Sequence, residues 1–108
     1  LGFSAAGALE GAWKIKTGNL LSFAEQQLVD CSTMNYGAME LVNKAFNYYK
    51  TSNAIAEGNY LYTARDGTCA YSSKAHTAAL TTGYTNVAAS NVTAMKSALA
   101  IKPLSVSI

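Results

Sequence analysis

Residues 3–17 are mostly small or apolar, with good helix formers throughout and no proline. Gly18 follows as a typical helix stop, so the pattern predicts a helix over residues 3–17. Gly7 and Gly11 lie one turn apart, and each costs roughly 1 kcal/mol in an exposed helix. We therefore expect a buried helix whose glycines allow another backbone to pack closely.

Two more helices follow in the first half of the chain. Ser22 and Glu25 have the spacing of a capping box, in which each side chain satisfies a free amide at a helix start. This predicts a second helix that runs to about Cys31. The third is predicted over residues 39–49, where one face carries apolar side chains at helical spacing, namely Met39, Val42, Phe46 and Tyr49.

The second half of the chain has a different pattern. Residues 51–73 are irregular, and residues 79–87 resemble a strand. Ser90 or Asn91 then caps a predicted helix over residues 92–101. With helices first and strands later, the order of elements predicts an α+β fold.

The last residues alternate between apolar and polar side chains, as in a half-buried strand: Leu104, Ser105, Val106, Ser107 and Ile108. The alternation continues to the final residue without a turn, so we expect the sequence to be a piece of a longer protein. The opening residues show neither a signal peptide nor a transit peptide.

Composition narrows the class of protein. The chain has 108 residues, of which 50% are hydrophobic and 13% charged, with one proline. This fits one globular domain and excludes a disordered chain. A net charge of +2 without a basic cluster argues against a nucleic-acid partner. The apolar runs are far shorter than the roughly 18 residues of a membrane span. One His and two Cys at no recognisable ligand spacing predict neither a metal nor another cofactor.

Cys31 and Cys69 lie beside turn-rich segments, and an even number of cysteines around a long irregular stretch predicts a disulfide in a secreted or luminal protein. Two alternatives are separate buried thiols in a cytosolic protein, and a nucleophilic Cys31 with His76 as its base. The second is disfavoured because reactive thiols prefer the start of a helix and Cys31 ends one. The polar surroundings of His76 predict an exposed side chain.

Asn91-Val92-Thr93 has the sequence of an N-glycosylation site. The same Asn91 is equally well placed to cap a helix. Three aromatic side chains in the irregular stretch either line a binding surface or cover the core: Tyr60, Tyr62 and Tyr71.

Taken together, the sequence resembles the papain-like cysteine peptidases, and most of all their cathepsin L branch. The first block is FSAAGALEGAWKIKTGNLLSFAEQQLVDCS, at residues 3–32. Shorter blocks are AFNYYK at 45–50, YTARDGTC at 62–69, GYTNV at 83–87 and KPLSVSI at 102–108. The resemblance covers nearly the whole chain but only about half of such an enzyme.

The resemblance implies a thiol endopeptidase, inactive as this isolated segment. Its nucleophilic Cys would immediately precede Leu1, and its His and Asn would follow Ile108. The oxyanion-hole Gln would also lie upstream. His76 does not match the catalytic His. Within the chain the resemblance implies no catalytic residue.

The resemblance also implies a fold with a mainly helical left lobe and a β-barrel right lobe. Residues 1–73 would form the helical lobe, and residues 74–108 the first elements of the barrel. Cys31 and Cys69 match a family disulfide. Leu41 and Val42 align with the wall, and Ser107 with the floor, of the pocket for the substrate's second residue.

The family context implies peptide or protein substrates, a propeptide or cystatin-like inhibitor as partner, and a lysosomal, vacuolar or secreted location. Three features depart from the family pattern. Leu1 stands where the family has Trp, Leu61 replaces a Pro, and residues 36–40 replace a Gly-rich stretch whose backbone pairs with substrate. The altered Gly-rich stretch suits a second hypothesis, a non-catalytic relative that acts as a binding or structural module. A third is an engineered or pseudogene-derived half-domain, which would oligomerise or unfold.

Overall fold

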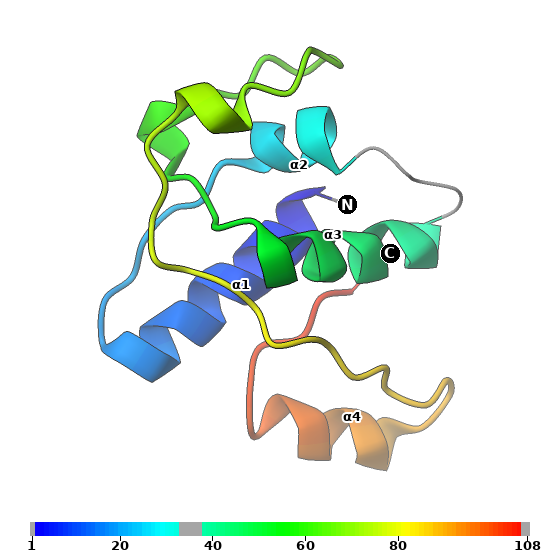
Figure 1. Cartoon of the computed structure of the whole chain (residues 1–108). Helices are drawn as coiled ribbons and strands as arrows, with labels where there is room; N and C mark the ends of the chain where they lie inside the picture. Colours follow the sequence, from blue (N-terminus) through cyan, green and yellow to red (C-terminus); the bar gives the residue numbers. More distant parts are fainter. Residues whose placement is uncertain (1, 33–37, 107–108) are drawn as a thin grey trace.

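Three helices pack together and a fourth stands apart from them in this computed structural model (Figure 1). The structure describes residues 2–32 and 38–106, and of residues 2 and 38–41 it describes the backbone only. The α-helices are α1 (Gly2–Thr17), α2 (Glu25–Cys31), α3 (Ala38–Thr51) and α4 (Val92–Leu99). Two short 3-10 helices are η1 (Glu57–Asn59) and η2 (Tyr71–Ser73).

The prediction of α1 is confirmed, and Gly18 ends it. Gly18 has φ +80°, a left-handed conformation that glycine adopts without strain. Its amide donates to the Lys14 carbonyl at 2.8 Å. The burial expected for α1 applies only to its first half, where four small or apolar side chains are buried: Ala5, Ala6, Ala8 and Leu9. In the second half, residues 10–13 are half-buried and residues 14–17 are exposed.

The two glycines of α1 have different surroundings. A Cβ at Gly11 would lie 2.6 Å from Cγ of Pro103. The Pro103 ring therefore packs against α1 in the space that the missing side chain of Gly11 leaves. A Cβ at Gly7 would have no atom within 4 Å. At Gly11 a neighbour does approach closely, but it is the side chain of Pro103 and not the expected backbone. At Gly7 nothing approaches, and the prediction is wrong there.

This difference gives a matched pair of variants. Gly7→Ala is expected to raise the free energy of unfolding by about 0.5–1 kcal/mol, because alanine loses less backbone entropy than glycine in a helix. Gly11→Ala has the same helical gain but must displace Pro103, and overpacking costs about 1–3 kcal/mol. Urea unfolding should therefore rank Gly7→Ala as clearly more stable than Gly11→Ala. Equal midpoints would contradict the packing of Pro103.

The start of α2 differs from the prediction. Phe23 forms an isolated antiparallel bridge with Ala56, which holds it in extended backbone. Because of this bridge the helix begins only at Glu25, and its N-cap is Ala24, which has no side-chain capping bond. The capping box predicted for Ser22 and Glu25 is therefore wrong. A contact far along the chain outweighs the local signal.

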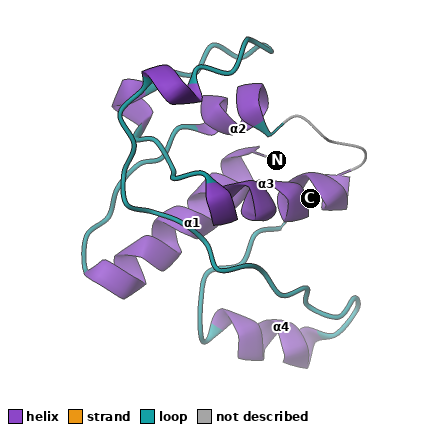
Figure 2. Ribbon diagram, viewed as in Figure 1, coloured by secondary structure: helices purple, strands orange, loops and turns teal. Residues whose placement is uncertain are grey.

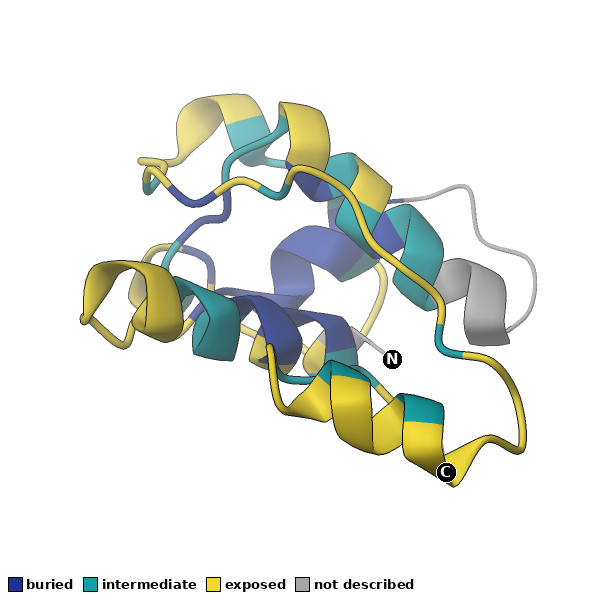
Figure 3. Ribbon diagram, turned by 90° about the horizontal axis from the view of Figure 1, so that it is seen from below, coloured by how far each residue is buried: buried dark blue, intermediate teal, exposed yellow. Residues whose placement is uncertain are grey.

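The helix predicted over residues 39–49 is confirmed as α3. The main core lies where α1, α2 and α3 meet (Figure 3). Its buried members are Ala5, Leu9, Phe23, Leu28, Ala45, Tyr49, Ala54 and Ala79. Tyr49 is fully buried, and its hydroxyl has no hydrogen-bond partner among the described residues. Burial raises the pKa of Tyr49.

The predicted strands do not form in the described part of the chain, which consists of helices and loops (Figure 2). Thr77 and Ala54 share one backbone hydrogen bond of 2.9 Å, and Ala54 and Ala79 share another. Together with a bond of 3.0 Å from the Thr81 amide to the Tyr49 carbonyl, they hold the segment near α3 without building a ladder. A strand needs a continuous partner, and residues 79–87 have none here. Of the predicted terminal strand, residues 107 and 108 lie outside the described residues.

The last helix, α4, has the cap that the sequence indicates. Asn91 Oδ1 accepts a hydrogen bond from the Ala94 amide at 2.8 Å. The helix ends at Leu99, two positions before the predicted end at Ile101. Of the two candidate caps, the structure thus selects Asn91.

Candidate functional site

The first turn of α1 is tied to the last described segment of the chain. Ser4 and Ser105 share a hydrogen bond of 2.6 Å between their hydroxyl oxygens. The Ser4 hydroxyl also donates to the Val106 carbonyl at 2.9 Å and accepts from the Val106 amide at 3.1 Å. The first turn of α1 and residues 105–106 therefore lie side by side. This arrangement fixes the N-terminal end of α1 against residues 103–106.

The N-terminal end of α1 favours a negative charge. The helix has 16 residues and no acidic residue in its first turn, so the positive end of its dipole is not compensated locally. Beside this end, the rings of Phe3 and Tyr62 pack edge to face with their centroids 5.1 Å apart, and both rings are partly exposed. A thiol placed before the helix would have a lowered pKa.

The predicted substrate-pocket residues are described only in part. Val42 is half-buried in α3, a helix that packs against α1. Leu41 belongs to α3, but its side chain lies outside the description. Ser107 follows Val106 and lies outside the described residues. The described contacts therefore do not bring these three side chains together.

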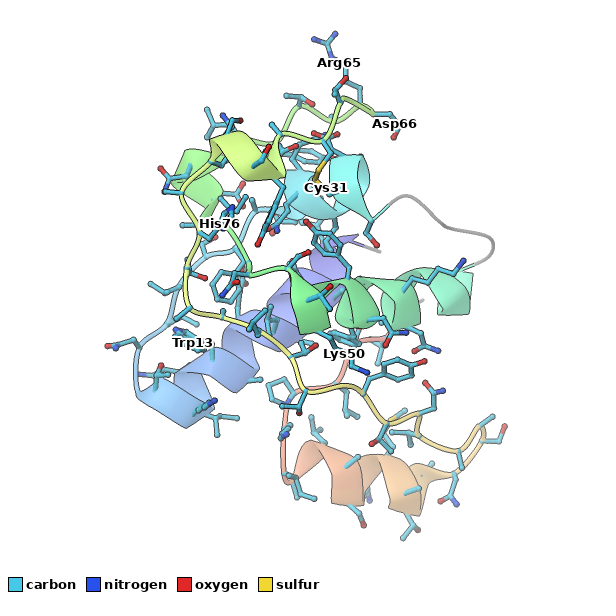
Figure 4. The ribbon with its side chains drawn as sticks, viewed as in Figure 1. Trp13, Cys31, Lys50, Arg65, Asp66 and His76 are labelled. Atoms are coloured by element: carbon cyan, nitrogen blue, oxygen red, sulfur yellow. A yellow bond between two sulfur atoms is a disulfide. The ribbon has the colours of Figure 1, made fainter. Side chains whose placement is uncertain are left out.

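The disulfide prediction is confirmed. Cys31 and Cys69 are bonded with an S–S distance of 2.06 Å (Figure 4), and they are the two cysteines of the sequence. His76 is exposed, as predicted, and stacks on Tyr71 with ring centroids 3.9 Å apart. A nucleophilic Cys31 with His76 as base is wrong, because the disulfide consumes the thiol.

The tyrosines of the irregular stretch mainly cover the core. Tyr60 is buried and Tyr71 half-buried, whereas Tyr62 is exposed. The Tyr60 hydroxyl donates to Asp30 Oδ2 at 2.7 Å and accepts from the Ala70 amide at 3.1 Å. Burial, together with the neighbouring Asp30, raises the pKa of Tyr60.

Asp30 is the centre of a buried polar network that the sequence pattern did not indicate. Its Oδ1 accepts hydrogen bonds from Gln26 Nε2 and from the Gly67 amide, both at 2.8 Å. Gln26 in turn binds the backbone of Thr63 and Arg65 at 3.0 and 2.8 Å. These bonds and the disulfide attach the loop of residues 60–70 to α2. No spacing rule signals such a network.

Three carboxyl groups meet where α2 begins, and this cluster too was missed. Glu10 of α1 accepts a hydrogen bond from the Phe23 amide at 2.8 Å. Glu25 is buried and hydrogen-bonds with Glu57. Burial, then the hydrogen bond and charge of Glu57, then the charge of Glu10, raise the pKa of Glu25 to about 7. The cluster can therefore hold a proton close to neutral pH.

The described ranges, 2–32 and 38–106, contain no group of three or more His, Cys, Asp or Glu side chains that could hold a metal ion. Within the same ranges, no helix has the length and apolar character needed to cross a membrane.

Comparisons with known proteins agree on one family. The profile of the papain family cysteine proteases matches residues 1–108. The chain is 46% identical to digestive cysteine proteinase 2 of Homarus americanus, with 98% of this chain and 34% of that protein covered. It is 37% identical to procathepsin L of Rattus norvegicus, with 98% and 33% covered. The chain thus spans about one third of the curated relatives it matches.

A solved structure has the same backbone arrangement. The crystal structure of the Carica candamarcensis cysteine protease CMS1MS2, in complex with E-64, superposes with a TM-score of 0.84 at 31% identity. The match covers 94% of this chain and 48% of that one.

Proposed function

Because the chain belongs to the papain family of cysteine proteases, we propose that it forms part of a thiol endopeptidase that hydrolyses peptide bonds through an acyl-enzyme. The observation that carries this proposal is the helix α1. It lies within the family match, begins at Gly2 and has no acidic residue in its first turn. Such a helix start stabilises a thiolate placed just before it.

In this proposal the chain supports catalysis without supplying the reacting groups. The nucleophilic Cys precedes Leu1, and the general base His and its Asn follow Ile108. Residues 1–73 belong to the helical lobe and residues 74–108 to the start of the barrel lobe. The Ser4 hydroxyl, bound to Ser105 and Val106, holds the two lobes in register beside the nucleophile.

The substrate would be a peptide or protein bound between the lobes. Leu41 and Val42 would line the wall, and Ser107 the floor, of the pocket for its second residue. Val106, which precedes Ser107, is anchored to Ser4 at the start of α1. A propeptide or cystatin-like inhibitor would occupy the same cleft. The Cys31–Cys69 disulfide supports a lysosomal, vacuolar or secreted location.

The 108-residue chain alone is expected to have no peptidase activity. Both of its cysteines are in the disulfide, so it holds no thiol to act as nucleophile. A fluorogenic dipeptide should stay intact when incubated with the purified chain under oxidising conditions. Hydrolysis that the Cys31→Ser variant abolishes would contradict this prediction.

A non-catalytic module is the second candidate, favoured by the side chains of Ala38, Met39 and Glu40. They occupy positions where the resemblance implies a bare glycine backbone that pairs with substrate. The two candidates differ in the residue before Leu1, which peptide mapping of the natural protein would identify. A Cys there that reacts with E-64 supports the endopeptidase, and any other residue supports the module.

A further inference from the structure

We propose that Asn91 is an N-glycosylation site, and that the same side chain caps α4 while it carries the glycan. The inference rests on the secretory location proposed above and not on peptidase chemistry. The acceptor sequence is Asn91-Val92-Thr93. No other asparagine in the sequence has Ser or Thr two residues later, so the chain offers a single acceptor.

The two ends of the Asn91 amide have separate roles. Its Oδ1 accepts the hydrogen bond from the Ala94 amide at 2.8 Å. Its Nδ2 makes no hydrogen bond with any part of the chain that the structure describes. N-linkage replaces one hydrogen of Nδ2 and leaves the carbonyl oxygen unchanged. The capping bond and the modification are therefore chemically compatible.

The surroundings of Asn91 leave room for a large group. Residues 88–93 are all exposed, and Ser90 turns the chain with φ +54° just before the helix. Figure 3 shows that α4 itself has mainly exposed residues, in contrast to the buried centre of the molecule. A glycan on Nδ2 would thus displace none of the core side chains of this chain.

The reaction requires a sugar donor of the secretory pathway, a polyprenyl-diphosphate-linked oligosaccharide. The Asn91 nitrogen bonds to the anomeric carbon of the first sugar, and the bond from that carbon to the diphosphate oxygen breaks. The lipid diphosphate leaves with the electron pair, and the amide nitrogen loses one proton. No oxidation or reduction takes place.

The first test uses the protein isolated from its natural source. Peptide-N-glycosidase F in heavy-oxygen water should convert Asn91 to an aspartate that carries the label, which mass spectrometry of the peptide detects. The same sample is checked for the Cys31–Cys69 disulfide. An intact disulfide with an unmodified Asn91 overturns the glycan alone. A reduced pair of cysteines with an unmodified Asn91 overturns the glycan and the proposed secretory location together.

Four variants of the full natural chain, made in a secreting eukaryotic host, separate the cap from the acceptor. Asn91→Asp keeps a capping oxygen and removes the acceptor nitrogen, whereas Asn91→Ala removes both. Thr93→Ala removes the hydroxyl of the acceptor sequence, and Thr93→Ser keeps it. We expect the glycan on the wild type and Thr93→Ser only. A glycan that persists in Asn91→Asp would overturn the proposal.

Thermal unfolding of the wild type, Asn91→Asp and Asn91→Ala, each made in the bacterial periplasm so that Asn91 of the wild type stays an unglycosylated asparagine, tests the capping half of the proposal. Asn91→Asp should unfold at the same temperature as the wild type, and Asn91→Ala at a lower one. Equal unfolding temperatures for all three would show that Asn91 does not cap α4.

Discussion

Replacing Cys31 and Cys69 together by alanine is expected to lower the free energy of unfolding by about 4 kcal/mol. The disulfide closes a loop with a sequence separation of 38, and opening it returns conformational entropy to the unfolded chain. We expect this decrease in stability to come mainly from the higher conformational entropy of the unfolded chain. In the folded protein the Asp30 network still holds the loop of residues 60–70 in place. The urea midpoint of the double variant, compared with that of the oxidised wild type, measures the effect.

Reduction provides the control for this prediction. A reductant should lower the wild-type midpoint to nearly that of the double variant and leave the double variant unchanged. If the oxidised wild type and the double variant unfold at the same urea concentration, then hydrogen bonds at Asp30, and not the covalent link, fix the loop.

The helices were predictable because their signals are local. A run of good helix formers ending at Gly18 defines α1, and the Asn91 side chain caps α4 within its own first turn. The disulfide was predictable because the sequence has only two cysteines in suitable surroundings. The residues that end or cap these helices are close to them in sequence, and each cysteine has only one other cysteine with which to pair.

The errors have the opposite cause. The capping box at Ser22 fails because Phe23 pairs with Ala56, a residue that no local rule connects to it. The strand predicted over residues 79–87 fails because alternation indicates which face is apolar but not which partner is present. Tertiary pairing decides both outcomes.

The buried polar residues of α2 show most clearly what a sequence pattern cannot predict. Gln26, Gln27 and Asp30 are buried, although such residues usually mark an exposed helix face. Gln27 is satisfied by the Asn53 carbonyl at 2.9 Å and the Ile55 amide at 2.8 Å. These partners are backbone groups of a distant loop. A pattern of side-chain polarity contains no information about them.

The protein is expected to lose stability as the pH rises from about 4.5 to about 7. Glu25 has its ordinary pKa of 4.5 in the unfolded chain and a pKa of about 7 when folded, so folding takes up a proton between these values. The unfolded state binds fewer protons there, and the free energy of unfolding therefore falls as pH increases. The stabilisation is complete below pH 4.5 and is lost above about pH 7.

The change in the free energy of unfolding follows from the rise in the pKa of Glu25. At 1.36 kcal/mol per pKa unit, it amounts to at most about 3 kcal/mol. The surroundings of Glu25 cause the rise in its pKa. Deprotonation places a charge in a buried position, breaks the proton-sharing bond with Glu57 and adds repulsion from Glu10. The nearby Tyr49 hydroxyl is neutral throughout this range, because burial raises its pKa above the usual value.

Glu25→Gln separates this carboxyl from every other source of pH dependence. Glutamine has nearly the same shape, donates a hydrogen bond to Glu57 and does not titrate, so urea midpoints of the variant should change much less between the two pH limits. Asp66→Asn, at an exposed carboxyl in the loop tip (Figure 4), is the matched control and should keep the wild-type dependence. An unchanged pH dependence in Glu25→Gln would mean that Glu25 is not the group that takes up a proton on folding, and that another carboxyl produces the dependence.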